Sequence, residues 1–191
     1  MRRSVAARLV RERLDPSDVV VCGLGSTARA WREQHAPHPT YYASDPMGMA
    51  PALALGLALA RPDRKIVLLE GDGDLAMNLG VLITIAGAAP TNLRVAVFIN
   101  ERYETGGGQG LPNAGRISYV TLAAGAGWPW TGEAHDQAQA ARLFPALLEL
   151  PGLGFLAVHV DAEPSPYPPD AGPTSQAEDR AVFQRRLSDE R

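Results

Sequence analysis

Two apolar segments of the sequence each end in a polar residue that could bind a metal ion. Segment 66–69 is followed by Asp72 between two glycines, and segment 95–99 is followed directly by Asn100. If both segments are parallel neighbouring strands, Asp72 and Asn100 meet at one edge of the sheet, where ligands of such sheets bind. Carboxylate and amide oxygens are hard ligands that suit Mg²⁺ and its phosphate partners. The pattern therefore predicts a magnesium site that could hold a phosphorylated ligand.

The same loop has features that favour an anion. Gly71 and Gly73 allow the backbone to turn tightly and to approach a ligand closely. A helix beginning near Asp74 would offer free N–H groups and its positive dipole end. No Lys or Arg lies between Gly71 and Thr91, so a metal ion and backbone amides would have to neutralise a phosphate. The lysine of a GxxxxGK[ST] phosphate loop is absent.

Strands and helices alternate along the chain and would position these residues. Strands are predicted at 19–22, 40–42, 66–69, 95–99 and 155–160, with a short extended piece at 128–130. Helices are predicted at 26–35, 49–60, 75–88, 117–126, 136–148 and 175–187, and the apolar positions Val5, Leu9, Val10 and Leu14 fit one face of a first helix. Most strands are apolar at every position, which is typical of strands covered on both faces. We expect an α/β fold with a doubly wound, mainly parallel sheet, right-handed crossovers and helices on both faces.

Length and composition agree with one domain. The chain has 191 residues, of which we assign 1–161 to the domain and 162–191 to a proline-rich tail with a terminal helix. The formal charge of −3 gives no electrostatic reason to expect nucleic-acid binding. No run of about twenty apolar residues predicts a membrane span. The single cysteine, Cys22, agrees with a cytoplasmic location.

The motif around Asp72 resembles the signature of thiamine-diphosphate-dependent enzymes. Gly71-Asp72-Gly73 is followed by twenty-five residues and then by Ile99-Asn100, where the family has two asparagines. The resemblance implies that Asp72 and Asn100 bind Mg²⁺ through their side chains and Arg102 through its backbone carbonyl. Where Asp74 stands, the family often has Ser or Ala, which leaves the role of a second carboxylate open.

Further segments are similar to the cofactor-binding parts of that family. Met47-Gly48 resembles the segment in which a bulky side chain supports the bent cofactor, and the carbonyl of Asp45 would accept the 4′-amino group. The loop 23–27 matches a diphosphate-binding loop, although its Gly-x-Gly could equally be a bare strand–helix connection. The cofactor-binding residues implied are Gly25, Ser26, Thr27, Asp45, Met47, Gly71, Gly73 and Asp74.

The segment after the metal motif is similar to that of sulfopyruvate and phosphonopyruvate decarboxylases of the beta type. It runs from Tyr103 to Gln109, and the similarity to those chains covers roughly residues 19–160. Glu104 and Gln109 lie in this glycine-rich loop and are the candidate catalytic residues of this chain. A solvated loop without substrate contact is the alternative.

The resemblance also implies a partner. Such enzymes pair the diphosphate-binding domain with a pyrimidine-binding domain that supplies the key glutamate, and this chain contains only the former. We expect a two-component 2-oxo acid decarboxylase whose site is shared with a separate pyrimidine-domain (alpha) subunit, in a hetero-oligomer such as α2β2 or larger. The alternatives are a carboligase subunit of the acetolactate-synthase type and a non-catalytic cofactor-binding module.

The sequence favours structural or surface roles for the histidines. His159 falls in the last predicted strand and is expected in the core, and His135 is expected at the start of a helix. His35 and His38 are three residues apart, but Pro37 breaks the helix between them and no further Cys or His accompanies them, so a surface pair is expected rather than a metal site.

Overall fold

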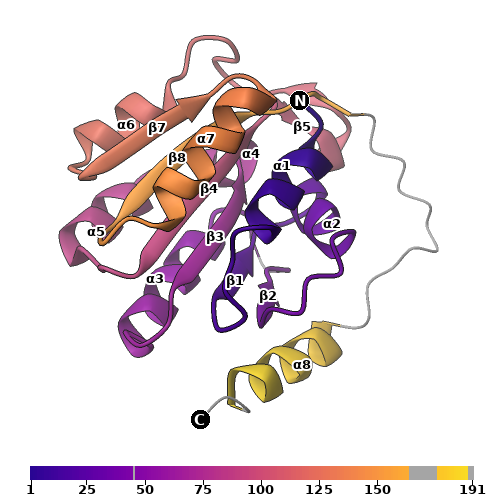
Figure 1. Cartoon of the computed structure of the whole chain (residues 1–191). Coiled ribbons are helices and arrows are strands. Elements are labelled where there is room, and N and C mark those ends of the chain that lie inside the picture. The colour runs from indigo at the N-terminus through magenta and orange to yellow at the C-terminus, as the bar shows by residue number, and fades with distance from the viewer. Residues whose placement is uncertain (45, 164–175, 189–191) are drawn as a thin grey trace.

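Six parallel strands form the central sheet of the computed structural model, which describes residues 1–44, 46–163 and 176–188. The strand order is β2-β1-β3-β4-β8-β7 (Figure 1). The strands are β1 (Val19–Cys22), β2 (Thr40–Tyr42), β3 (Ile66–Gly71), β4 (Leu93–Ile99), β7 (Trp130–Ala134) and β8 (Gly154–His159). A small antiparallel hairpin, β5 (Arg102–Tyr103) with β6 (Gln109–Gly110), lies beyond the end of β4. The predicted parallel α/β sheet is confirmed.

Helices cover both faces of this sheet. One face packs against α1 (Arg3–Arg11), α2 (Ser26–Arg32) and α7 (Gln137–Leu148). The other packs against α3 (Ala50–Ala60), α5 (Val81–Ala88), α6 (Tyr119–Gly125) and α8 (Gln176–Ser188). The short helices α4 (Asp72–Ala76) and η1 (Glu104–Gly106) follow the ends of β3 and β5. The doubly wound arrangement with two helical layers is therefore as the sequence predicts.

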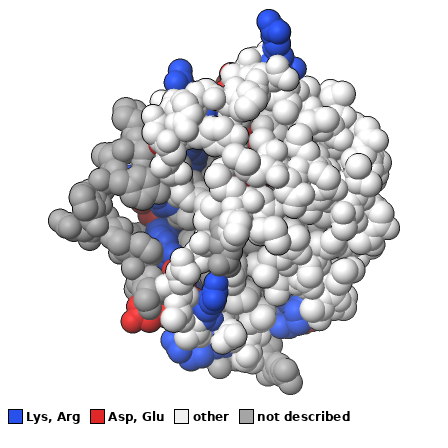
Figure 2. All heavy atoms as spheres, turned by 180° about the vertical axis from the view of Figure 1, so that it is seen from behind, with Lys and Arg blue, Asp and Glu red and all other residues white. Residues whose placement is uncertain are grey.

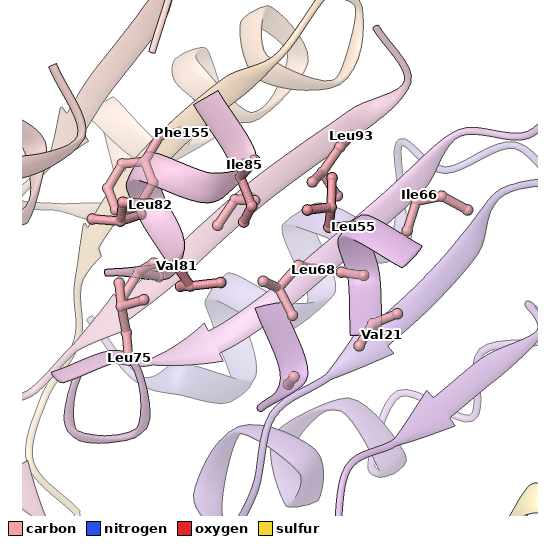
Figure 3. Packing of buried hydrophobic residues seen from close by; sticks show 14 of the residues in the cluster. Val21, Leu55, Ile66, Leu68, Leu75, Val81, Leu82, Ile85, Leu93 and Phe155 are labelled. Atoms are coloured by element: carbon pink, nitrogen blue, oxygen red, sulfur yellow. The ribbon is translucent and has the colours of Figure 1, made fainter. Parts of the chain in front are cut away.

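The continuous apolar strands are explained by these two cores. Successive residues of a strand point to opposite faces of the sheet, so neighbouring positions pack into opposite helical layers. Leu68 belongs to the core under α3 and α5, whereas Leu69 belongs to the core under α1 and α7. Figure 3 shows the first of these cores, in which Leu55, Ile85 and Phe155 pack with Leu68.

Three local expectations differ from the structure. The helix expected at 75–88 is divided into α4 and α5 by a turn at 77–80. Strand β7 is longer than the extended piece expected at 128–130 and overlaps it only at Trp130. Its sequence mixes polar residues with glycine, and it pairs on one side only, so no apolar pattern marks its full length. In α1 the buried face is formed by Arg3, Ala6, Ala7 and Val10, and Val5 and Leu9 are only partly buried.

Helix α8 packs against the edge strand β2. Phe183 lies edge-on to Tyr41 with ring centroids 5.5 Å apart, and Asp179 pairs with Arg32 of α2. Residues 164–175, which include most of the expected proline-rich segment, lie outside the described residues. Within the described part of the chain, no helix combines the length and apolarity needed to cross a lipid bilayer.

Candidate active site

The site lies at the carboxyl edge of the sheet, where the strand order changes direction. Strand β1 pairs with β2 on one side and with β3 on the other, so the loops after β1 and β3 open onto one crevice. A pocket occupies this position. It is lined by Arg3, Leu24, Ser26, Thr27, Met47, Gly71, Asp72, Gly73, Asp74, Phe98, Asn100, Arg102, Tyr103, Glu104 and Thr105.

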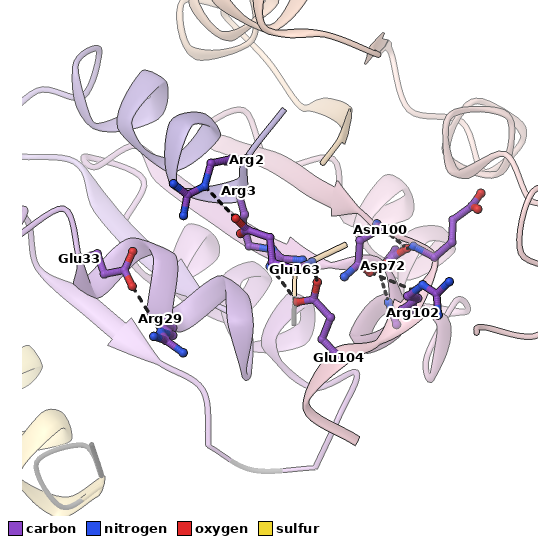
Figure 4. A network of polar contacts seen from close by, with 11 residues as sticks. Arg2, Arg3, Arg29, Glu33, Asp72, Asn100, Arg102, Glu104 and Glu163 are labelled. Carbon is purple, nitrogen blue, oxygen red and sulfur yellow. Dashed lines mark hydrogen bonds and ion pairs between the residues drawn. The ribbon is translucent and has the colours of Figure 1, made fainter. Parts of the chain in front are cut away.

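Asp72 and Asn100 are brought together as their strand positions predict. Strands β3 and β4 pair in parallel, and Gly71 lies beside Phe98. The Oδ2 atom of Asp72 accepts hydrogen bonds from the backbone N–H groups of Asn100, at 3.1 Å, and of Glu101, at 2.6 Å (Figure 4). Its Oδ1 atom accepts from Gly73 N–H at 2.9 Å. The carboxylate is thus held at the end of the neighbouring strand.

Burial sets the electrostatics of Asp72. The residue is 2% exposed, and this burial raises the pKa of its carboxyl to about 6, although three backbone hydrogen bonds favour the charged form. A carboxylate held in such surroundings gains from a cation. The donors that the motif predicts are the Asp72 carboxylate, the Asn100 amide oxygen and the Arg102 carbonyl, which are all oxygens; the Asn100 oxygen accepts from Arg102 N–H at 3.1 Å. This donor set fits Mg²⁺ and its preference for oxygen ligands.

Two glycines keep the pocket walls close together. Gly25 has a φ of +65°, which favours glycine, and begins the turn into α2. A Cβ atom added to Gly73 would lie 2.9 Å from the Tyr103 ring, so only glycine fits there without a shift. Both glycines lie at the starts of helices, α2 and α4, a position whose N–H groups favour an anion, although the Gly73 N–H already donates to Asp72.

Asp74 turns away from the metal ligands and joins two loops. Its Oδ2 atom accepts from Leu24 N–H at 3.1 Å, and its Oδ1 atom accepts from Gly48 N–H. Glu70 lies beside it, wholly buried, and burial together with the charge of Asp74 raises the pKa of Glu70 well above its ordinary value. The Oε1 atom of Glu70 accepts from Gly71 N–H at 2.9 Å, and its Oε2 atom has no hydrogen-bond partner among the described residues. Sequence reasoning did not foresee this bonding, because no motif indicates it.

A family model described as thiamine pyrophosphate enzyme, C-terminal TPP binding domain, matches residues 23–158. The chain belongs to this family. The match begins in the loop after β1 and ends in β8, so it includes both strand ends that form the pocket. The resemblance inferred from the motif is thereby confirmed.

Relatives of this TPP-binding domain include decarboxylases. The chain is 39% identical to sulfopyruvate decarboxylase subunit beta of Methanothermobacter thermautotrophicus over 92 residues, which is 48% of this chain and 49% of the relative. It is 37% identical to phosphonopyruvate decarboxylase of Streptomyces hygroscopicus over 113 residues, 56% of this chain and 26% of the relative. The chain thus spans half or less of the length of these relatives. Benzoylformate decarboxylase from Polynucleobacter necessarius has the same fold, with a TM-score of 0.74 at 20% identity over 87% of this chain and 34% of that one.

The other residues that the motif predicts for cofactor binding lie in different parts of the site. Met47 lines the pocket and is 38% exposed, and Ser26 and Thr27 form the first turn of α2 at its rim. Gly71 precedes α4 as its N-cap. Asp45 lies outside the described residues.

Glu104 and Gln109, the candidate catalytic residues, differ in environment. The Glu104 carboxylate pairs with Arg3 of α1 at 2.8 Å and accepts from Glu163 N–H at 2.8 Å. Burial alone would raise the pKa of Glu104, but hydrogen bonds from Ser26 and Arg3 lower it below its ordinary value. Gln109 is exposed on β6 and does not line the pocket. Arg3 was not foreseen as part of the site, since it is far from the motif in sequence.

Proposed function

We propose that this chain is the diphosphate-binding subunit of a cytoplasmic thiamine-diphosphate- and Mg²⁺-dependent 2-oxo acid decarboxylase. The observation that carries the proposal is the buried Asp72 carboxylate, held against the backbone of Asn100 at the carboxyl ends of adjacent strands. The family assignment supports the cofactor. The names of the relatives support sulfopyruvate or phosphonopyruvate as the substrate type.

The roles of the residues follow from their positions. Asp72 and Asn100 would hold Mg²⁺ by their side chains, and Arg102 by its carbonyl. The bound cofactor supplies an electron sink for the carbanion left by decarboxylation. The chain itself would bind and orient: N–H groups at the starts of α2 and α4 would bind the diphosphate, and Met47 would support the ring system. The groups assigned to diphosphate binding are Gly25, Ser26, Thr27, Gly71, Gly73 and Asp74, with the Asp45 carbonyl for the 4′-amino group.

A separate pyrimidine-domain subunit would complete the site in a hetero-oligomer such as α2β2. Similarity to a chain named subunit beta supports this arrangement. The surface of this chain also supports it. Figure 2 shows a broad area with few charged side chains, and the large apolar residues Met49, Leu59, Met77, Ile83 and Leu122 are exposed around α3, α5 and α6. Such an uncharged face is typical of a surface that another chain covers.

The affinity for Mg²⁺ and cofactor should depend on pH through Asp72. Its pKa is raised from 3.8 to about 6 by burial, and Mg²⁺ binds the carboxylate but not the acid. We expect a constant affinity above about pH 7 and a loss of up to about tenfold per pH unit below about pH 6. Without ligand, the stability of the fold changes with pH in the opposite direction. The folded state binds more protons than the unfolded state between the two pKa values of Asp72, so the free energy of unfolding falls as pH rises through that window. Calorimetric titration and denaturant unfolding from pH 4 to 8, roughly spanning both values, measure the two effects.

The proposal is tested by reconstitution. This chain alone should not consume sulfopyruvate or phosphonopyruvate, and addition of the pyrimidine-domain chain with Mg²⁺ and thiamine diphosphate should start release of CO₂ and an aldehyde. Turnover by the single chain would contradict the shared site. Cofactor binding by the two chains without turnover of any 2-oxo acid would favour the non-catalytic module, and a product joining two carbonyl compounds would favour the carboligase.

A further inference from the structure

A second group of potential ligands lies at the same sheet edge, outside the pocket. Glu133 is near the end of β7, His135 follows that strand, and His159 is the last residue of β8. Strands β7 and β8 pair in parallel with Ala134 beside Val158, so the next residues, His135 and His159, become cross-strand neighbours. His159 is therefore not the core residue that its apolar strand predicts, because the strand ends at the surface there.

The three side chains converge. The Glu133 Oε1 atom lies 2.8 Å from His159 Nε2, and Glu133 Oε2 lies 3.9 Å from His135 Nε2. The two imidazole rings are stacked, with centroids 4.4 Å apart and planes 24° apart. One ligand atom from each residue lies within 4.8 Å of the other two. Two ligands of one zinc ion are about 3 to 3.5 Å apart, because each bond is about 2 Å long.

We propose that Glu133, His135 and His159 form a binding site for a divalent transition-metal ion of the zinc class. Two imidazole nitrogens and one carboxylate oxygen are the ligand set of many open zinc sites, whereas Mg²⁺ prefers oxygen alone. The side chains are 33%, 59% and 34% exposed, respectively, so an ion can reach them and a water molecule can complete the coordination. The site is distinct from the Asp72 site, which has only oxygen donors.

The common face of the three residues supports this assignment. In β8, Phe155 and Ala157 belong to the core on the side of α6, so His159 points to that side by alternation. In β7, Ala134 belongs to the opposite core, which places Glu133 and His135 on the side of α6 as well. The backbone therefore presents all three side chains on one face, and small rotations of the side chains suffice to surround an ion.

Zinc titration tests the proposal. Zn²⁺ is titrated calorimetrically into the full chain with Mg²⁺ in excess, which occupies the oxygen site. We expect one equivalent to bind, with the affinity lowered at least about tenfold in His159→Gln and in His135→Gln. The matched control is His35→Gln, which changes an exposed histidine away from the group and should bind like the unchanged chain.

Thermal unfolding separates loss of the site from loss of the fold. Zn²⁺ should raise Tm in the unchanged chain and in His35→Gln, and should leave it unaltered in His159→Gln. The proposal is overturned if no saturable zinc binding is found, or if binding survives both cluster substitutions with equal affinity. The latter result would leave an ordinary Glu–His hydrogen bond. Neither outcome bears on thiamine diphosphate binding, which is measured separately.

Discussion

Replacement of Asp72 by asparagine is expected to abolish Mg²⁺-dependent binding of thiamine diphosphate, with a loss of affinity of at least about 100-fold. Changes to groups that merely orient metal ligands already cost about 10- to 100-fold, and Asp72→Asn removes a ligand charge itself. The asparagine keeps the size of the side chain but offers one oxygen, whereas both oxygens of Asp72 accept backbone hydrogen bonds. Calorimetric titration of the two-chain complex and of this chain alone measures the effect.

The control for Asp72→Asn removes a negative charge elsewhere. Asp63 is 60% exposed and pairs with Arg61 at 2.7 Å, outside the pocket. Asp63→Asn should retain the affinity of the unchanged chain. Asp72→Asn also replaces one acceptor of backbone N–H groups by a donor, so thermal unfolding of the apo variant is measured to confirm that it is folded at the titration temperature. Cofactor binding that stays metal-dependent and equally tight in Asp72→Asn would contradict the assigned metal site.

Replacement of Arg3 by alanine is expected to destabilise the fold by about 3 to 5 kcal/mol. The side chains of Arg3 and Glu104 are 6% and 5% exposed, so removal of the cation leaves a buried carboxylate without its charge partner. For a chain of this size the loss corresponds to a fall in Tm of roughly 10 °C. Denaturant unfolding of Arg3→Ala measures it directly.

A surface pair of α1 provides the matched control. Arg8 and Glu12 are 3.9 Å apart and about half exposed, so Arg8→Ala should change the free energy of unfolding by less than about 0.5 kcal/mol. Because the pKa of Glu104 is lowered in the folded state, its stabilising contribution is present above the ordinary carboxyl pKa and is lost as pH falls through the folded value. Equal effects of Arg3→Ala and Arg8→Ala would refute the buried pair.

The same residue pair distinguishes two roles for Glu104. If Glu104→Gln lowers kcat of the two-chain complex but leaves its Tm unchanged, the result would support contact between Glu104 and substrate. A fall in Tm with unchanged turnover of the folded complex would support a purely structural role. Arg3→Ala, measured beside it, gives the effect of losing the ion pair while the Glu104 carboxyl is kept.

The sequence predicts the sheet and the meeting of Asp72 with Asn100 because both depend on local patterns. Apolar runs identify the strands, and parallel pairing places equivalent strand ends together. The bonding of Asp74 to Gly48 and the pairing of Arg3 with Glu104 could not be predicted, because each joins segments whose relative placement depends on helix packing. The convergence of Glu133 with His159 depends on the register of β7, an edge strand without a clear apolar pattern.

The contact between α1 and the loop after β5 has a kinetic consequence. It joins the first helix to the middle of the chain, so a long loop must close before it forms. We therefore expect this wall of the pocket to be completed late in folding. We expect ligands that need this wall to slow unfolding of the finished protein while leaving the rate of folding nearly unchanged.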